Sequence, residues 1–67
     1  MDKAQKLLLI AFKAEVDSAR ERAKRLRKLS EYAAGGKKDM LQLASMEDES
    51  AKWYDKIMQN FKKARGL

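Results

Sequence analysis

Basic side chains recur at every seventh position in the first half of the chain, at Lys6, Lys13, Arg20 and Arg27. Lys24 lies four residues after Arg20 and therefore joins the same flank of a helix. Such a row of cations could bind successive phosphates of a nucleic acid, with little regard to base sequence. The structural alternative is that these residues flank a coiled-coil seam, where they pair with acids or cover apolar groups with their stems.

An acidic run, Glu47–Glu49, offers partners for these cations. A chain that folds back at Gly35 and Gly36 brings this run opposite residues 22–24. The two charge runs then either neutralise each other or leave the basic row available to a ligand. We expect no divalent-ion site on the acidic run, because consecutive residues of a helix point in different directions.

The composition excludes most reactive sites. The chain has no cysteine and no histidine, so it lacks disulfides, thiolate or imidazole metal ligands, and a histidine base for its serines. Its three glycines cannot form a phosphate-binding loop of the usual glycine-rich kind. We therefore expect neither enzymatic activity nor a cofactor or metal ion.

The charge and the hydropathy indicate a cytoplasmic protein. Of the 67 residues, 39% are charged, and the formal net charge is +6. The apolar run at Leu7–Phe12 is far shorter than the ~20 residues of a membrane-spanning helix. We therefore do not expect a membrane as the partner.

Helix-forming residues dominate the chain, and it has no proline. We expect a single all-α domain over residues 1–67, with one helix over about 2–34, a turn over 35–38 and a second helix over about 39–65. Asp2 and Asp39 suit the starts of the helices, and Gly35 suits the end of the first. Ser45 with the acids after it is also a helix-start signature, so the second helix could begin there instead. The unbroken spacing of apolar residues favours a continuous helix.

Each predicted helix carries an apolar seam whose spacings alternate between three and four residues. In the first helix this seam comprises Leu9, Phe12, Val16, Ala19, Ala23, Leu26, Ser30 and Ala33. In the second it comprises Met40, Leu43, Glu47, Ser50, Tyr54, Ile57, Phe61 and Ala64. We expect Glu47 to find Arg22 or Lys24 as its partner, because a buried charge is costly when unpaired. The aromatic residues of the seams predict a main core at the open end of the hairpin, where Lys3 and Lys6 should approach Lys62, Lys63 and Arg65.

An antiparallel hairpin of two helices is too small to cover its own apolar residues, and it has no disulfide or metal to stabilise it. We therefore expect a homodimer that forms a four-helix bundle. The residues predicted to contact a second copy or another protein are Leu8, Ile10, Leu29, Met46, Trp53 and Met58. The function predicted from these features is a non-catalytic oligomerisation or protein–protein interaction module. The alternative is a dimeric nucleic-acid-binding protein that uses the basic row.

Overall fold

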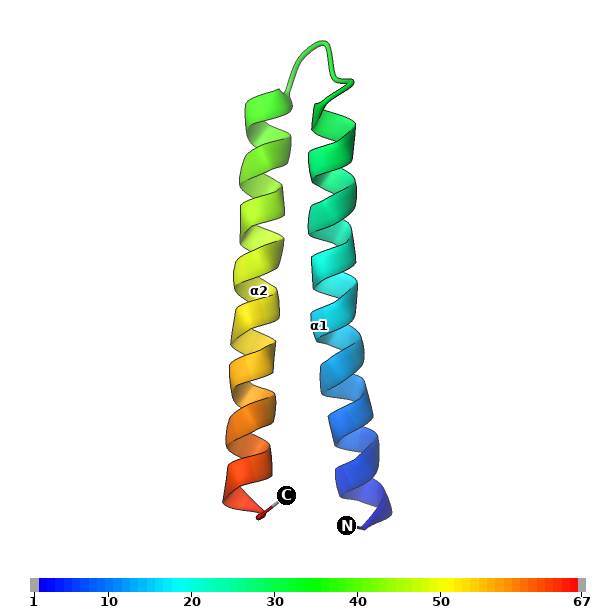
Figure 1. Ribbon diagram of the computed structural model, residues 1–67, viewed down its shortest axis with the longest axis vertical. Helices are drawn as coiled ribbons and strands as arrows, with labels where there is room; N and C mark the ends of the chain where they lie inside the picture. The colour runs from blue at the N-terminus through cyan, green and yellow to red at the C-terminus, as the bar shows by residue number, and fades with distance from the viewer. Residues whose placement is uncertain (1, 67) are drawn as a thin grey trace.

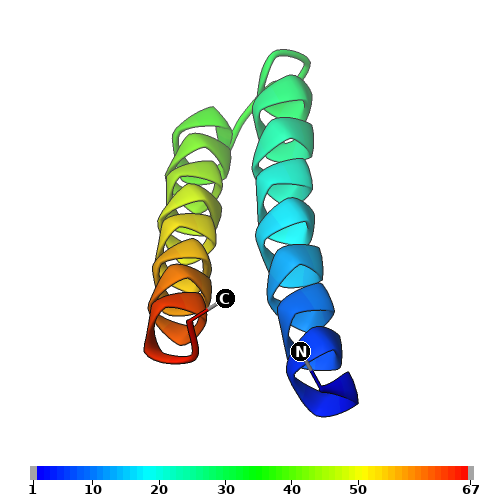
Figure 2. The ribbon, with the colours of Figure 1, turned by 60° about the horizontal axis from the view of Figure 1, so that its bottom comes forward.

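Two long helices lie side by side in the computed structural model, which describes residues 2–66 (Figure 1). Helix α1 spans Lys3–Ser30, helix α2 spans Lys37–Ala64, and residues 31–36 connect them. The helices run antiparallel, so both ends of the chain lie at the same end of the rod, and Figure 2 shows the same pairing after a 60° turn. The described residues contain no strand. The prediction of an all-α hairpin is confirmed.

Asp2 caps α1 as predicted, because its side chain accepts a hydrogen bond from the backbone N–H of Gln5 at 2.8 Å. The end of α1 was predicted wrongly, since the helix stops at Ser30 and not near residue 34. There the N–H of Glu31 donates to the carbonyl of Lys28 at 3.2 Å, and the Ser30 hydroxyl donates to the carbonyl of Arg27 at 2.7 Å. These bonds satisfy carbonyls that a longer helix would have used, so no glycine is needed to close it.

Helix α2 begins at Lys37, two residues before the predicted start. Gly36 occupies the capping position with φ at 73°, in the left-handed region that glycine tolerates best. Asp39 therefore lies in the first turn, where its charge offsets the positive end of the helix dipole. The helix continues through Ser45, whose hydroxyl donates to the carbonyl of Leu41 at 3.2 Å. The interpretation of a continuous second helix is confirmed, and a start at Ser45 is excluded.

The seam predicted for α1 is confirmed, because every residue of it is buried or half-buried. Of the seam predicted for α2, four alternate residues are half-buried: Met40, Glu47, Tyr54 and Phe61. At the positions between these four, the predicted seam residues each lie one residue before the residue that the structure buries. The structure buries Ala44, Ala51 and Met58, whereas Leu43 and Ser50 are exposed and Ile57 is only half-buried.

Small side chains explain this shift of the second seam. Ala19 and Ala23 on α1 face α2 and have no exposed surface. Ala44 on α2 faces α1 and is also fully buried. Alanine at the contact lets two backbones approach closely, whereas leucine there would hold them apart. The buried cluster consists of Val16, Ala19 and Ala51, with Tyr54 packed against it.

The aromatic core predicted at the open end is only partly present. Phe12 and Phe61 meet there with ring centroids 6.0 Å apart, but both rings are half-buried. Trp53 is 60% exposed and touches its neighbour Tyr54 edge-on at 5.2 Å. The most complete burial therefore lies in the middle of the rod, among small residues.

Replacing Ala23 by leucine should lower the free energy of unfolding by about 1–3 kcal/mol, because the added side chain has no room between the helices. The matched control is Ala14→Leu on the exposed surface of α1, which should change stability little. Urea unfolding followed by circular dichroism, with all proteins at one concentration, measures both. Equal stability of the two variants would contradict a close-packed alanine seam.

Replacing Gly36 by alanine should lower the free energy of unfolding by about 1 kcal/mol, because an L residue is strained at this φ. Gly35→Ala is the control, since a Cβ at either glycine meets nothing within 4 Å and Gly35 has no positive φ. Thermal unfolding of the two variants isolates the backbone term. A similar loss at both positions would show that the turn geometry is not the cause.

Candidate interaction surfaces

Two inter-helix ion pairs define two sides of the hairpin. The Nε of Arg22 donates to the Oε2 of Glu47 at 2.9 Å, and Arg27 pairs with Asp48. Glu47 and Asp48 are consecutive and point in different directions from α2, and Arg22 and Arg27 likewise leave α1 on different sides. The two pairs therefore bridge the helices on opposite sides of the seam.

Large apolar residues gather on the side of the Arg22–Glu47 pair. On α2, Leu43, Met46 and Trp53 are spaced so that they share one face with the half-buried Ile57. Leu43 lies one turn before Glu47 and is 50% exposed, while Met46 is 58% exposed. The α2 face of this side is thus mainly apolar and lies outside the seam, with the exposed Ser50 between Met46 and Trp53.

Helix α1 contributes leucines to the same side, of which Leu8 and Leu29 are exposed and Leu26 is half-buried. Leu29 and Leu26 line a shallow hollow together with Arg22, Arg25 and Glu47. Leu8 lies two heptads before Arg22, and seven residues are almost two full turns, so it projects on the same side. We call this surface the apolar side, and it comprises Leu8, Leu29, Leu43, Met46, Trp53 and Ile57.

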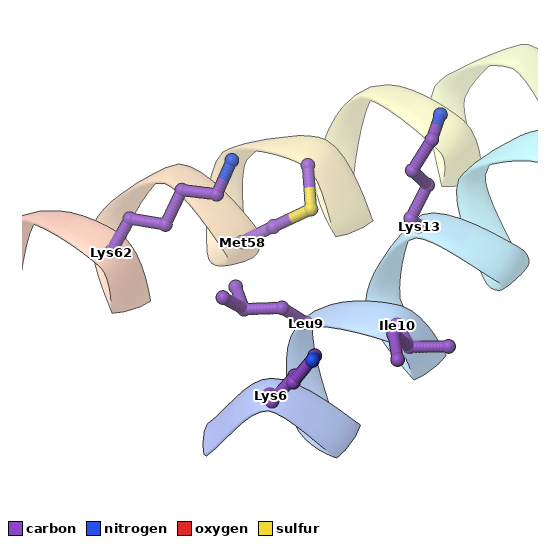
Figure 3. Close-up of a pocket in the computed structure, with 6 residues that line it drawn as sticks. All are labelled: Lys6, Leu9, Ile10, Lys13, Met58 and Lys62. Carbon is purple, nitrogen blue, oxygen red and sulfur yellow. The ribbon is translucent and has the colours of Figure 1, made fainter. Parts of the chain in front are cut away.

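The opposite side carries a hollow of about 360 Å³ between the helices (Figure 3). Leu9 and Met58 form its floor, and Ile10 lies at its edge. Lys6 and Lys13 from α1 and Lys62 from α2 complete the lining, so three ammonium groups surround an apolar floor. No acidic residue lines this hollow. We call this surface the basic side, and it comprises Lys6, Lys13, Arg20, Lys24 and Lys62.

Of the residues predicted to contact phosphate, some form ion pairs within the hairpin and others do not. Arg27 pairs with Asp48 across the helices, and Lys13 contacts Asp17 at 3.3 Å within α1. Within residues 2–66, Lys6, Arg20 and Lys24 make no ion pair. The predicted neutralisation by the acidic run is therefore partial, because it engages Arg22 and Arg27 and leaves the rest of the row.

Glu47 is half-buried and pairs with Arg22, one of the two predicted partners. The third acid of the run, Glu49, approaches Lys52 of its own helix at 3.6 Å, with both side chains exposed. Lys6 and Lys62 share the hollow, as expected from the approach of the two basic ends. Arg65 lies over the Phe61 ring at 4.0 Å from the ring centroid.

The residues predicted as oligomer contacts fall in three places. Leu8, Leu29, Met46 and Trp53 all belong to the apolar side. Ile10 is exposed but lies beside the lysines on the basic side. Met58 was misplaced, since it is only 9% exposed and its side chain packs in the seam. The exposed Leu43 and the half-buried Ile57 were not predicted as contact residues, because both were assigned to the seam.

The described residues contain neither a metal-binding cluster nor a helix that could span a membrane. No group of three or more acidic side chains among residues 2–66 could hold a metal ion. Neither α1 nor α2 combines the length and the apolar character that a membrane span requires.

The Arg22–Glu47 pair should show a coupling of about 0.2–1 kcal/mol in a double-mutant cycle with Arg22→Gln and Glu47→Gln, and salt should reduce it. The control is the Lys13–Asp17 pair, which is more exposed and lies within one helix. It should couple more weakly, because it holds no second helix in place. Urea unfolding at two salt concentrations measures both cycles, and equal couplings would contradict a role of Arg22–Glu47 in joining the helices.

The chain has no significant match among protein-family models, curated proteins or solved structures.

Proposed function

We propose that this protein is a non-catalytic self-association module, in which the apolar sides of two hairpins pack together in a four-helix bundle. The proposal rests chiefly on the excess of apolar surface on one side of the rod. Several exposed leucine, methionine and tryptophan side chains gathered on one side are typical of an interface. The spacings of three and four residues suit the shallow crossing angles of helix bundles.

The exposed area matches what a dimer would bury. A compact monomer of 7.7 kDa exposes about 4,300 Å². The hairpin exposes 5275 Å², an excess of roughly 1,000 Å² over that scale. A standard interface covers about 800 Å² on each partner, so a second copy of similar size accounts for the excess.

The shape of the hairpin supports the same conclusion. Its radius of gyration is 15.3 Å, whereas a compact chain of this length has about 11 Å. The Cα atoms extend over 50 × 16 × 10 Å, so the molecule is a thin rod with one broad apolar side. Two such rods packed side to side approach the proportions of an ordinary globular domain.

The distribution of charge favours a second copy as the occupant. On the apolar side, Arg22 and Glu47 pair within one hairpin, while Glu15 and Arg25 lie at its α1 edge and make no ion pair among residues 2–66. The lysines around the hollow lie on the opposite side, so two apolar sides can meet without bringing these cations together. A mainly apolar surface with charges of both signs at its edge can pack against a second copy of itself, as a two-fold interface requires.

Sedimentation equilibrium should show a dimer at micromolar concentration, and Trp53 fluorescence should shift to shorter wavelength as the concentration rises, because the ring becomes buried. The double variant Leu43→Gln/Met46→Gln should weaken the dimer by about a hundredfold or more, since each change occurs twice in the interface. Both residues are exposed in the single hairpin, so the fold of one chain should tolerate their replacement.

The matched control is Leu7→Gln/Leu41→Gln, which replaces two exposed leucines outside the apolar side and should leave the dimer intact. Circular dichroism reports whether each variant keeps its helices. If the first variant unfolds, the concentration series of the unaltered protein still decides. A monomer whose Trp53 emission is independent of concentration would overturn the proposal, as would equal disruption by the control.

A further inference from the structure

We propose that the basic side binds the phosphate backbone of a nucleic acid, with the lysine-rimmed hollow as its strongest point. This inference goes beyond self-association, because the site lies within one hairpin and on the side that a dimer would leave open. Compared with the basic row predicted from the sequence, the proposed site includes Lys62 of α2 and leaves out Arg27.

The hollow concentrates positive charge that nothing on its lining neutralises. Lys6, Lys13 and Lys62 surround it, and its remaining lining residues are apolar (Figure 3). Lys6 and Lys62 meet no counter-charge on this lining, and the only acid in contact with Lys13 is the exposed Asp17 outside it, so the like charges repel one another. An anion seated between them relieves this repulsion, so the geometry favours a ligand with negative charge.

The cations continue along α1 beyond the hollow. Arg20 and Lys24 follow Lys13 on the same flank, and they make no ion pair with the described residues. From Lys6 to Lys24 the row extends over about 27 Å at ~1.5 Å per residue. A duplex carries a negative charge on every ~1.7 Å of its axis, so a regularly charged polymer can meet the whole row.

Three acids lie on this side: Asp17 on α1, and Asp48 and the half-buried Asp55 on α2, the last seven residues before Lys62. Asp55 makes no ion pair among residues 2–66, so it lowers the positive potential of the row without engaging one of its cations. Asp48 is engaged by Arg27 across the helices, so this arginine is not available to a ligand. Asp17 contacts Lys13 in a solvent-exposed pair, which exchanges readily for a phosphate. The ligand thus contacts cations from both helices. The proposed site is therefore a surface of the hairpin and not one face of a single helix.

The apolar residues of this side are too few to favour a bilayer. Membrane-surface helices place a continuous apolar stripe beneath their lysines. Here Ile10 is the exposed apolar residue beside the hollow, whereas the apolar side lies on the opposite face of the rod. Phosphates on a nucleic acid need no such stripe, because they are bound at the surface.

The test is fluorescence anisotropy with a labelled DNA duplex and a labelled RNA hairpin of about 20 base pairs each, at about 50 and 200 mM salt. The unaltered protein should bind at least one of them, and the affinity should fall steeply as salt rises. In Lys6→Gln/Lys13→Gln/Lys62→Gln the affinity at low salt should fall at least about tenfold, and the salt slope should decrease by about 2–3.

The matched control is Lys28→Gln/Lys37→Gln/Lys38→Gln, which removes the same charge near the turn, at the other end of the rod. It should bind with nearly unchanged affinity. Equal weakening by both triple variants would overturn the site, because net charge alone would then explain binding. Absence of binding at low salt, or binding to anionic phospholipid vesicles without binding to either nucleic acid, would overturn the proposal itself.

Self-association is tested separately in the same samples. Sedimentation should give the same oligomeric state for both triple variants as for the unaltered protein. Leu43→Gln/Met46→Gln should still bind nucleic acid through each hairpin, with a smaller salt slope. Loss of binding in that variant with its helices intact would place the site at the dimer interface and overturn the assignment to a single hairpin.

Discussion

The close approach of the two helices at small residues is the constraint on which the rest of this structure depends. Ala19 and Ala23 on α1 meet a face of α2 that buries Ala44 and Ala51. A seam of alanines brings backbones together but buries little apolar area for each residue. The larger apolar side chains of α2 are consequently turned away from the seam. The stability of one hairpin and its surplus of exposed surface thus have the same origin.

This rotation of α2 gives the rod two unlike sides. The turn of the helix places Glu47 and Asp48 on either side of the seam, and each meets an arginine of α1. These two pairs use most of the acidic run, and they separate an apolar side from a basic side. The proposed self-association and the proposed phosphate binding therefore use different surfaces of one hairpin. A dimer formed through the apolar sides would carry two basic sides facing outward.

Much of the fold could be predicted from residue spacing, and the errors have particular causes. The seam of α1 was found throughout, because its large and small apolar residues fall on one heptad pattern. On α2 two neighbouring apolar patterns share Met40, Glu47, Tyr54 and Phe61, and spacing alone does not choose between them. Sequence reasoning chose the larger side chains of Leu43 and Ile57, whereas packing against alanines selected Ala44 and Ala51. The observed helix ends differ from the predicted ones because the Ser30 hydroxyl bonds to the carbonyl of Arg27 and Gly36 adopts a positive φ. Both features depend on the neighbouring residues.

The sequence by itself determined two helices, a turn near the double glycine, and a row of cations at seven-residue intervals, because these features depend on local propensity and helical period. It also narrowed the partner of Glu47 to Arg22 or Lys24, since folding back at a known point sets an approximate register. Only the tertiary structure decided which stripe of α2 is covered, which arginines are used between the helices, and that Lys62 joins Lys6 and Lys13 around one hollow. These outcomes depend on the rotation of one helix against the other, which is set by how closely their side chains let them approach.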